Sequence, residues 1–474
     1  MVQLTQLDPQ SEQPLYRQLY DKIRHNIKTG VLESNERLPA TRELAGQLGL
    51  NRTTVSAAYA LLEADGLIKG HVGRGSFVAS TGTENVRPRT VTGAISFASS
   101  RPCQEQFPVT EFQASCREVI SGPEASTILQ LGSTSGYGPL RQYLLDEAVA
   151  NDVAGPDDDI LITNGCQQAL DLLQRLLVNS GDTVVMEDPV YHGVKNVFGR
   201  GGARVIGVPM RAEGIDVEQL GRVLMQERPK LLVITSNFQN PTGATLPLNA
   251  RQAIASLVQE TGVLLVENDI YGDLRYTGDP LPTVKQIERG GSTILLRSFS
   301  KIAFPGLRVG WVIAPRHIIA RLTETKQWCD LHTDQLSQAI LLRFAASGRL
   351  AALVKRVRTA GAERLKTALA ACERYLPAGS EFTRPEGGMS LWVRLPEPLD
   401  AADILPRAQR EGISYVPGRH FSVSQYDPGG LRLSFGGLSP AQIEAGLGVL
   451  GKIFQEELER SRGVDRFDAA AALV

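Results

Sequence analysis

Apolar residues in the first 80 positions recur at helical spacing, which predicts a helix over residues 15–29. Its apolar face is formed by Leu15, Leu19, Ile23 and Ile27. Two shorter helices are predicted over residues 41–48 and 52–63, joined by a tight turn at Gly49. Two strand-like runs around glycines follow over residues 67–78, which predicts a β-hairpin. This succession is typical of a winged helix-turn-helix.

From about residue 95 the pattern changes to short, continuous apolar runs that alternate with amphipathic stretches. The runs lie at residues 160–163, 183–186, 231–234, 263–266 and 293–296. Helical patterns follow two of them, at residues 167–177 and 250–259. Such runs predict an α/β domain with a mostly parallel sheet and helices on both faces. Ligands of these sheets bind at the carboxyl ends of the strands.

Composition adds few constraints. The 474 residues suggest two or three domains, and 42% hydrophobic and 21% charged residues are typical of a globular protein. The five cysteines lack metal or redox spacing, and no apolar run approaches the ~18 residues of a membrane helix. We therefore expect a reduced, cytoplasmic protein with no membrane segment and no metal site. A net charge of −1 does not by itself indicate nucleic-acid binding.

The strongest chemical signal is Lys301, in the segment Arg297-Ser298-Phe299-Ser300-Lys301, with Arg308 seven residues later. A lysine amine condenses with a carbonyl to form a Schiff base. Hydroxyl groups and a guanidinium suit a phosphate. The segment therefore suggests a site for an aldehyde on a phosphorylated ring, although a solvated surface lysine is the simpler alternative.

Other polar residues follow the apolar runs. The segment Asn164-Gly165-Cys166-Gln167 begins a predicted helix, whose N-terminus could bind an anion. Tyr191 could stack on a flat ring, Asn240 could present its amide to a ring oxygen, and Tyr271 suits a ring hydroxyl. Arg432 stands among apolar neighbours and requires a carboxylate, from a ligand or from the protein.

In the N-terminal module the candidate DNA contacts are Arg52, Thr53 and Thr54, at the start of the second helix of the motif. Arg42 and Arg74 could reach phosphates, a base edge or the minor groove. Charge alone leaves open a small interaction module with solvated arginines.

Two sets of motifs resemble known families. Leu38-Pro39-x-Thr41-Arg42-x-Leu44-Ala45, Leu48-Gly49-Leu50-Asn51-Arg52-x-Thr54-Val55 and Gly73-x-Gly75-x-Phe77-Val78 closely resemble the GntR-type winged helix-turn-helix. Asn240-Pro241-Thr242-Gly243, Ser298-Phe299-Ser300-Lys301, Pro305-Gly306-Leu307-Arg308 and Leu431-Arg432-Leu433-Ser434 stand in the order found in fold-type I aminotransferases. The whole chain resembles the MocR/GabR family of regulators.

The resemblance implies binding of double-stranded DNA, pyridoxal 5′-phosphate (PLP) as cofactor, a small amine or amino-acid effector, and a homodimer in the bacterial cytoplasm. It implies a DNA-binding domain over residues 11–80, a linker over 81–94, and an aminotransferase-like domain over 95–455 with a smaller C-terminal α+β subdomain. Lys301 is implied as the Schiff-base lysine, Tyr271 and Asn240 lie at the ring oxygen, and Tyr191 stacks on the ring. Arg432 is implied at a ligand carboxylate. The implied phosphate ligands are Cys166, Gln167, Ser298 and Arg308, and Gly165 and Ser300 are further candidates for cofactor binding.

The chain departs from the aminotransferase pattern at two positions. The aspartate that usually pairs with the pyridine nitrogen stands three residues before the tyrosine, but here that residue is Asn268, followed by Asp269. A neutral amide does not favour a protonated ring as a carboxylate does. Asp269 could replace it only where the strand is irregular, because neighbouring residues point to opposite faces. Leu131 also stands where a tyrosine is expected.

Three functions remain open. The first is a regulator that senses an amine or amino acid through PLP on Lys301, with weak or absent transamination. The second is an aminotransferase with an appended DNA-binding domain. The third is a regulator whose large domain only holds the dimer together.

Overall fold

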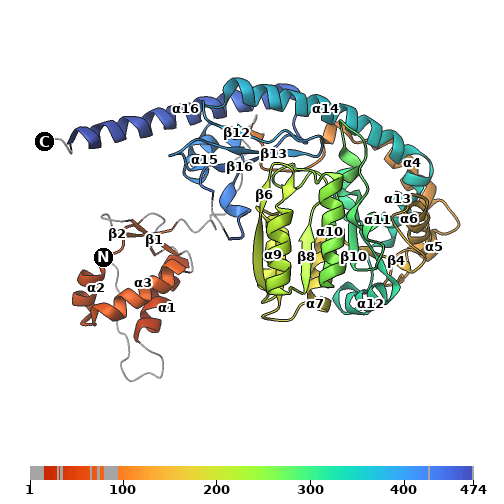
Figure 1. Cartoon of the computed structure of the whole chain (residues 1–474), viewed down its shortest axis with the longest axis horizontal. Coiled ribbons are helices and arrows are strands. Elements are labelled where there is room, and N and C mark those ends of the chain that lie inside the picture. Colours follow the sequence, from red (N-terminus) through yellow and green to blue (C-terminus); the bar gives the residue numbers. More distant parts are fainter. Residues whose placement is uncertain are drawn as a thin grey trace. The chain divides into compact units, whose positions relative to one another are not determined.

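The computed structural model describes residues 15–28, 31–32, 36–64, 67–71, 75–79, 94–424 and 427–471. The chain forms two compact units, Met1–Thr92 and Gly93–Val474. Most of the predicted linker over residues 81–94 lies outside the described residues. Figure 1 colours the two units along the sequence.

The N-terminal unit contains α1 (Leu15–Lys28), α2 (Thr41–Leu48), α3 (Arg52–Ala64), β1 (Ile68–His71) and β2 (Gly75–Val78). The two strands pair antiparallel and form the predicted hairpin. The predicted apolar face of α1 is confirmed, because Leu19, Ile23 and Ile27 are buried. The unit therefore has its own small core, built from one face of each helix and from the hairpin.

Caps at the end of α2 and the start of α3 set the turn between the two helices. Gly49 ends α2 with φ of 64°, in the left-handed region where glycine carries no steric cost. Asn51 precedes α3, and its Oδ1 accepts a hydrogen bond of 3.2 Å from the backbone N–H of Thr53. Three residues thus separate the two helices of the motif.

The large unit is built on an eight-stranded sheet of order β4-β11-β10-β9-β8-β5-β6-β7. Strands β10, β9, β8, β5 and β6 run parallel to one another, so the predicted mostly parallel sheet is confirmed. Strand β11 lies antiparallel between β4 and β10, and β7 is antiparallel to β6. The strands span β4 (Asp158–Thr163), β5 (Thr183–Asp188), β6 (Arg204–Arg211), β7 (Gly214–Ile215), β8 (Leu231–Ile234), β9 (Leu264–Asn268), β10 (Thr293–Ser298) and β11 (Gly310–Pro315).

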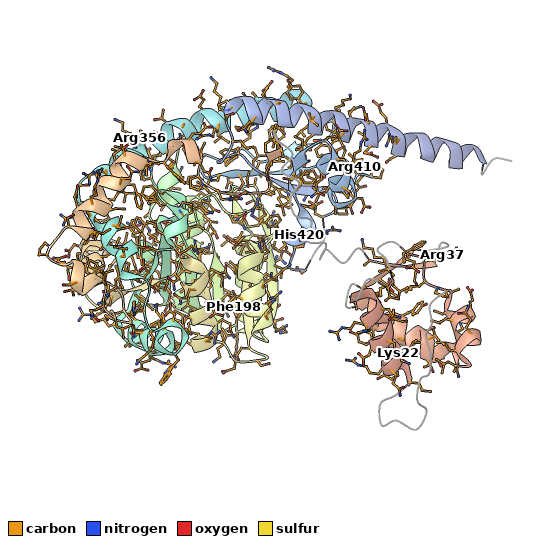
Figure 2. All side chains as sticks on the ribbon, turned by 180° about the vertical axis from the view of Figure 1, so that it is seen from behind. Lys22, Arg37, Phe198, Arg356, Arg410 and His420 are labelled. Carbon is orange, nitrogen blue, oxygen red and sulfur yellow. The ribbon has the colours of Figure 1, made fainter. Side chains whose placement is uncertain are left out.

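Helices cover both faces of this sheet because successive strand residues point in opposite directions. Val184 and Met186 pack with α7 (Cys166–Leu177), α8 (His192–Arg200) and α12 (Arg316–Asp330). Val185, between them, packs with α9 (Val217–Glu227) and α10 (Leu248–Thr261) on the other face. Phe198 of α8 is fully buried in the first of these layers, and Figure 2 labels its position among the side chains of the large unit.

A third layer covers the β4 end of the sheet. It includes α4 (Val109–Ile120), α5 (Ala125–Ile128), α6 (Gly138–Ala150) and α13 (Gln335–Ala346). A short helix, α11 (Val284–Glu288), precedes β10.

The C-terminal part forms the predicted smaller α+β subdomain. Its sheet has the order β12-β13-β16-β15, and all neighbours are antiparallel. The long helices α14 (Arg349–Tyr375) and α16 (Pro440–Ala471) run along one side of the large unit, next to this sheet (Figure 1). The remaining elements are β12 (Glu381–Phe382), β13 (Ser390–Arg394), α15 (Ala401–Arg410), β14 (Ile413–Ser414), β15 (Val416–Pro417), β16 (Gly430–Ser434) and β3 (Ile95–Ser96), which pairs with β14.

No helix among the described residues combines the length and the apolar character that crossing a bilayer requires.

Candidate cofactor site

A cavity of about 330 Å³ lies at the carboxyl ends of the parallel strands. Polar residues reach it from the loops after β4, β5, β8, β9 and β10, as expected for an open α/β sheet. Eleven of the predicted cofactor and ligand residues line it: Cys166, Gln167, Tyr191, Asn240, Asn268, Tyr271, Ser298, Ser300, Lys301, Arg308 and Arg432. The structure therefore brings together side chains from across more than half of the large unit.

Lys301 ends a 3-10 turn, Phe299–Lys301, directly after β10. Its Nζ donates a hydrogen bond of 2.6 Å to the backbone oxygen of Ser100 and lies 5.5 Å from the centre of the Tyr271 ring. Burial of the amine, followed by the positive charges of Arg432 and Arg308, lowers the pKa of Lys301 to about 8. A lysine with this pKa is a stronger nucleophile at neutral pH than a solvated one.

This pKa predicts how the reactivity of Lys301 depends on pH. Only the neutral amine attacks a carbonyl, and with a pKa of about 8 roughly a tenth of it is neutral at pH 7. The rate at which the apoprotein combines with PLP should rise with pH and level off above about pH 8. Stopped-flow absorbance at a series of pH values measures this rate. A rate that continues to rise to about pH 10, the ordinary range of lysine, would contradict the prediction.

The loop after β4 forms one end of the cavity. Gly165 has φ of 77° and precedes α7, whose first N–H groups have no partners within the helix. A Cβ atom at Gly165 would lie 2.5 Å from Nη2 of Arg308, so the guanidinium packs where a side chain would otherwise stand. Arg308 also donates from Nη1 to Oγ of Ser300 at 3.3 Å. A helix N-terminus, a guanidinium and hydroxyl groups converge here, which is the chemistry of a phosphate site.

A partly buried hydrogen-bond network holds this loop. Asp330, at the end of α12, accepts hydrogen bonds from Asn164 Nδ2 at 2.7 Å, Gln168 Nε2 at 2.6 Å and Lys326 Nζ at 2.7 Å. Asn164 directly precedes Gly165 in the chain, so these bonds hold the turn from which α7 begins.

Asn268 and Asp269 point to opposite sides of β9. Asn268 lines the cavity, is 5% exposed, and its Oδ1 is buried without a hydrogen-bond partner among the described residues. Asp269 is not among the lining residues; its carboxylate accepts from Asn237 Nδ2 and Arg297 Nη2, both at 2.8 Å. Asp269 is therefore occupied elsewhere, and a neutral amide faces the cavity. The prediction that Asp269 binds the cofactor is not supported by this geometry.

The side of the cavity towards the small subdomain is formed by Arg432 of β16. Arg432 donates to Asn240 Oδ1 at 2.9 Å and to the backbone oxygen of Ala98 at 2.5 Å, and its Nε has no partner among the described residues. Both acceptors are neutral, although the side chain is only 5% exposed. A buried guanidinium without a carboxylate partner suits an anionic ligand.

Tyr271 lies between Lys301 and Asn240. Burial raises the pKa of the Tyr271 phenol to about 12, and burial also raises the pKa of the Cys166 thiol to about 12. Both groups are therefore neutral near pH 7, and Tyr271 can donate a hydrogen bond. Burial likewise raises the pKa of Tyr191, whose ring centre lies 4.6 Å from that of His192.

The segment Ala98–Arg101 also lines the cavity, although no local pattern in the sequence marked it. Thr235 and His192 were missed as well, because a lone threonine or histidine after a strand carries no specific signal.

The candidate DNA contacts are only partly described. Arg52 and Thr53 are exposed on the first turn of α3, and Thr54 is half-buried. Arg42 lies in α2, and nothing is described of its side chain, while Arg74 lies outside the described residues. Arg52 and Thr53 therefore have the exposure that contact with a base or a phosphate requires.

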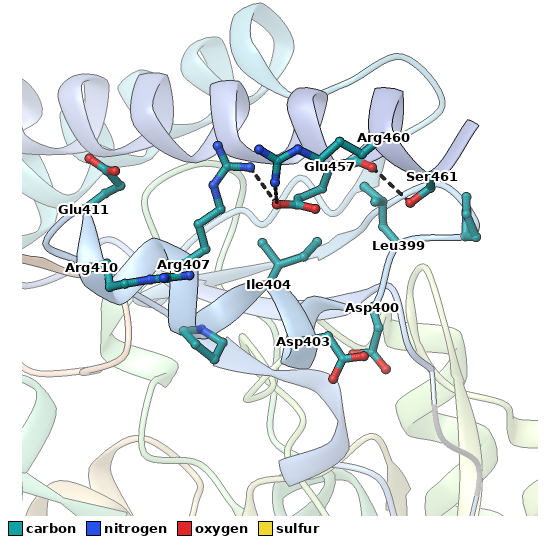
Figure 3. A pocket seen from close by; sticks show the side chains of 12 residues that line it. Leu399, Asp400, Asp403, Ile404, Arg407, Arg410, Glu411, Glu457, Arg460 and Ser461 are labelled. Atoms are coloured by element: carbon teal, nitrogen blue, oxygen red, sulfur yellow. Dashed lines mark hydrogen bonds and ion pairs between the residues drawn. The ribbon is translucent and has the colours of Figure 1, made fainter. Parts of the chain in front are cut away.

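A second, larger cavity of about 640 Å³ lies between α15 and α16 (Figure 3). None of the predicted site residues lines it. Three of its charged side chains are already paired: Arg407 Nη1 donates to Glu457 at 2.6 Å, Arg407 also pairs with Glu456, and Arg460 donates to Glu457 at 3.2 Å. Size alone therefore does not make it the functional site.

The first cavity fits PLP on three grounds. It offers a lysine for the aldehyde, a helix N-terminus with Arg308 for the phosphate, and the amide of Asn268, whose Oδ1 has no partner among the described residues, for the ring nitrogen. When bound there, PLP would supply an electrophilic carbon and an electron-withdrawing ring.

Comparison with known proteins agrees with this geometry. Residues 94–450 match the family model of aminotransferases of class I and II, and residues 15–78 match that of bacterial regulatory proteins of the gntR family. The fold and the site thus define an aminotransferase-type, PLP-dependent domain. The chain belongs to the class I and II aminotransferase family, in the MocR/GabR-type group whose members carry a GntR-type helix-turn-helix domain. This domain implies DNA binding.

Relatives are found among both enzymes and regulators. A 2-aminoadipate transaminase of Thermus thermophilus is 36% identical over 386 residues, covering 80% of this chain and 95% of the relative. An HTH-type transcriptional regulator of Escherichia coli, YdcR, is 30% identical over 468 residues, covering 94% and 99%. The crystal structure of a kynurenine aminotransferase of Pyrococcus horikoshii, in complex with PMP, has a TM-score of 0.75 and 34% identity, covering 78% and 92%.

Proposed function

We propose that this protein is a DNA-binding transcription regulator that holds PLP at Lys301 and senses a small amine or amino acid there. One observation carries the proposal: the cavity that is built for PLP presents the neutral Asn268, and not a carboxylate, at the strand position facing it, in a chain that begins with a GntR-type DNA-binding unit. A site of this kind can bind an amine without converting it rapidly.

Each polar residue of the cavity has a proposed binding role that follows from its chemistry. Lys301 is the attachment point, and its lowered pKa leaves part of it neutral at pH 7. The N-terminus of α7, Ser298, Ser300 and Arg308 are the proposed phosphate ligands, and Tyr191 the residue that stacks on the ring. Tyr271 and Asn240 are proposed at the ring oxygen.

Arg432 is the proposed binding group for an acidic substituent of the effector. Its guanidinium is buried and hydrogen-bonded only to neutral acceptors, so an added carboxylate would gain a charge-assisted hydrogen bond in a site already shielded from water. This preference supports an amino acid over a simple amine.

A homodimer is also proposed, since proteins of the aminotransferase fold are typically dimers. Large apolar side chains support a surface that another subunit covers: Trp328 is 88% exposed, Leu131 80% and Leu129 74%. Gln335 Nε2 donates to the backbone oxygen of Gln130 at 2.8 Å and so fixes the loop that carries the two leucines. Ligand binding changes DNA affinity only where it favours one state of the dimer over another.

The test is a titration of the PLP-loaded protein with a panel of amines and amino acids, read both by the visible spectrum and by affinity for promoter DNA at fixed salt. A compound that changes the spectrum should change DNA affinity by at least about fivefold. The control Arg52→Ala should weaken DNA binding and reduce the salt dependence by about one phosphate contact, with an unchanged spectrum. A spectral response that never alters DNA affinity would contradict the proposal.

The second candidate function, an aminotransferase with an appended DNA-binding unit, is favoured by the 36% identity with a transaminase. Rapid conversion of an added amino acid to its keto acid would favour it. The third, a dimerisation scaffold, would be favoured by regulation that is unchanged when Lys301 is removed.

A further inference from the structure

The residues around the cavity are unbalanced in charge. Four of them carry guanidinium or ammonium groups, namely Arg101, Lys301, Arg308 and Arg432, and no aspartate or glutamate is among the described residues that line it. Asp269, directly after Asn268 in the chain, binds Arg297 and Asn237. Anions brought by the ligands must therefore balance these cations.

Three of these four cationic residues already have a binding role in the proposed function. Arg308 suits the phosphate, Lys301 is the attachment point, and Arg432 suits one carboxylate of an amino acid. Arg101 has no such use. It takes part in no ion pair among the described residues, and its side chain makes one hydrogen bond to them, from Nε to Oγ of Ser99 at 2.5 Å. Both of its Nη groups thus remain available for a bidentate contact with an anion.

The backbone that carries Arg101 is held in place from several directions. Phe97 is buried in the core of the small subdomain, and its backbone oxygen accepts from Ser434 N at 2.8 Å. The Ser100 hydroxyl lies 2.7 Å from that of Ser434, and the Ser100 backbone oxygen accepts from Lys301. Arg101 therefore extends from a fixed point next to the reactive amine, while the side chain itself is exposed at the edge of the cavity.

We infer that Arg101 binds a second anionic group of the effector, so that the site selects amino acids with an acidic side chain over neutral ones. This inference rests on the proposed function, because it assumes that amino acids bind at this cavity. One carboxylate would pair with Arg432 and the other with Arg101, both of which line the cavity together with Lys301. Ser99 releases or shares the guanidinium when the ligand enters.

The experiment compares near-isosteric pairs of ligands on the PLP-loaded full-length protein. Affinities for L-glutamate and L-glutamine, and for L-aspartate and L-asparagine, are measured by spectral titration, with L-2-aminoadipate as a longer diacid. We expect the protein to prefer at least one acid over its amide by about tenfold or more, which is about 1.4 kcal/mol. Arg101→Gln should abolish that preference and leave affinity for the amide unchanged.

The controls separate a specific effect from a general one. Arg117→Gln removes an exposed arginine of α4 that does not line the cavity and should keep the preference. Arg101→Lys should retain part of it. Equal affinity for acid and amide in the unmodified protein would overturn the inference and leave the proposed function standing, as would an equal loss of affinity for both ligands in Arg101→Gln. No spectral response to any amino acid or amine would overturn the proposed function, and the inference with it.

Discussion

Lys301→Ala is expected to abolish covalent attachment of PLP and to weaken its binding by at least about a hundredfold, which is about 2.7 kcal/mol. Lys301 is the only lysine among the described residues that line the cavity, so no other amine can replace it there. The phosphate site at α7 and Arg308 remains, and weak non-covalent binding should persist. The measurements are the visible spectrum after gel filtration and mass spectrometry after borohydride reduction, which should find the adduct at position 301 only in the unmodified protein.

The same variant tests regulation. Basal DNA affinity should be unchanged, because the DNA-binding unit has its own core, whereas the response to the effector should be lost. Lys355→Ala, which removes an exposed lysine of α14, is the matched control and should keep both the adduct and the response. A reducible adduct on another lysine of Lys301→Ala, with the effector response intact, would show that position 301 is not the sensor.

The positions of the site residues could be predicted from the sequence because the strands that carry them could be predicted. Continuous apolar runs such as residues 231–234 and 293–296 are typical of strands that are buried on both faces of a sheet. In the structure these two runs form β8 and β10. Their carboxyl ends meet at one edge of the sheet. Asn240, Tyr271 and Lys301 follow three of these ends, so knowing the strands was enough to place them together.

Features that depend on pairing between distant segments were not predictable in this way. Strand β11 lies between β4 and β10 and is antiparallel to both. Its apolar residues alone do not specify in which direction the strand runs. The segment Ala98–Arg101 reaches the cavity because Lys301 and Arg432, more than 200 residues later, bind its backbone oxygens. Nothing in its own residues indicates those contacts.

The choice between Asn268 and Asp269 was decided by a packing partner. Alternation along a strand predicted that only one of them faces the cavity. Arg297, on the neighbouring strand β10, lies on the side of Asp269 and pairs with it, which leaves Asn268 on the cavity side. The ion pair could be located only once the register of β9 and β10 was known.

Asn268→Asp is expected to speed the transamination half-reaction with an amino acid by at least about tenfold, or about 1.4 kcal/mol in the barrier. A carboxylate at this position favours a protonated ring nitrogen, and a protonated ring withdraws electrons more strongly than a neutral one. The three cations Lys301, Arg308 and Arg432 offset part of the cost of placing a charge in this buried position. Single-turnover absorbance and keto-acid formation measure the rate, and the pH dependence of the visible spectrum reports the ring directly.

The matched control is Asp269→Asn, which removes a carboxylate one residue away. It leaves Arg297 without its buried partner, so it should lower the free energy of unfolding without changing the half-reaction rate per folded, PLP-loaded protein. If Asn268→Asp speeds the half-reaction and does not increase the affinity for DNA, then the asparagine slows turnover in the unmodified protein. This result would support a protein that senses a ligand and does not convert it rapidly. Turnover by the unmodified protein as fast as by Asn268→Asp would show that the amide imposes no such limit, and the enzyme with an appended DNA-binding unit would then be the better description.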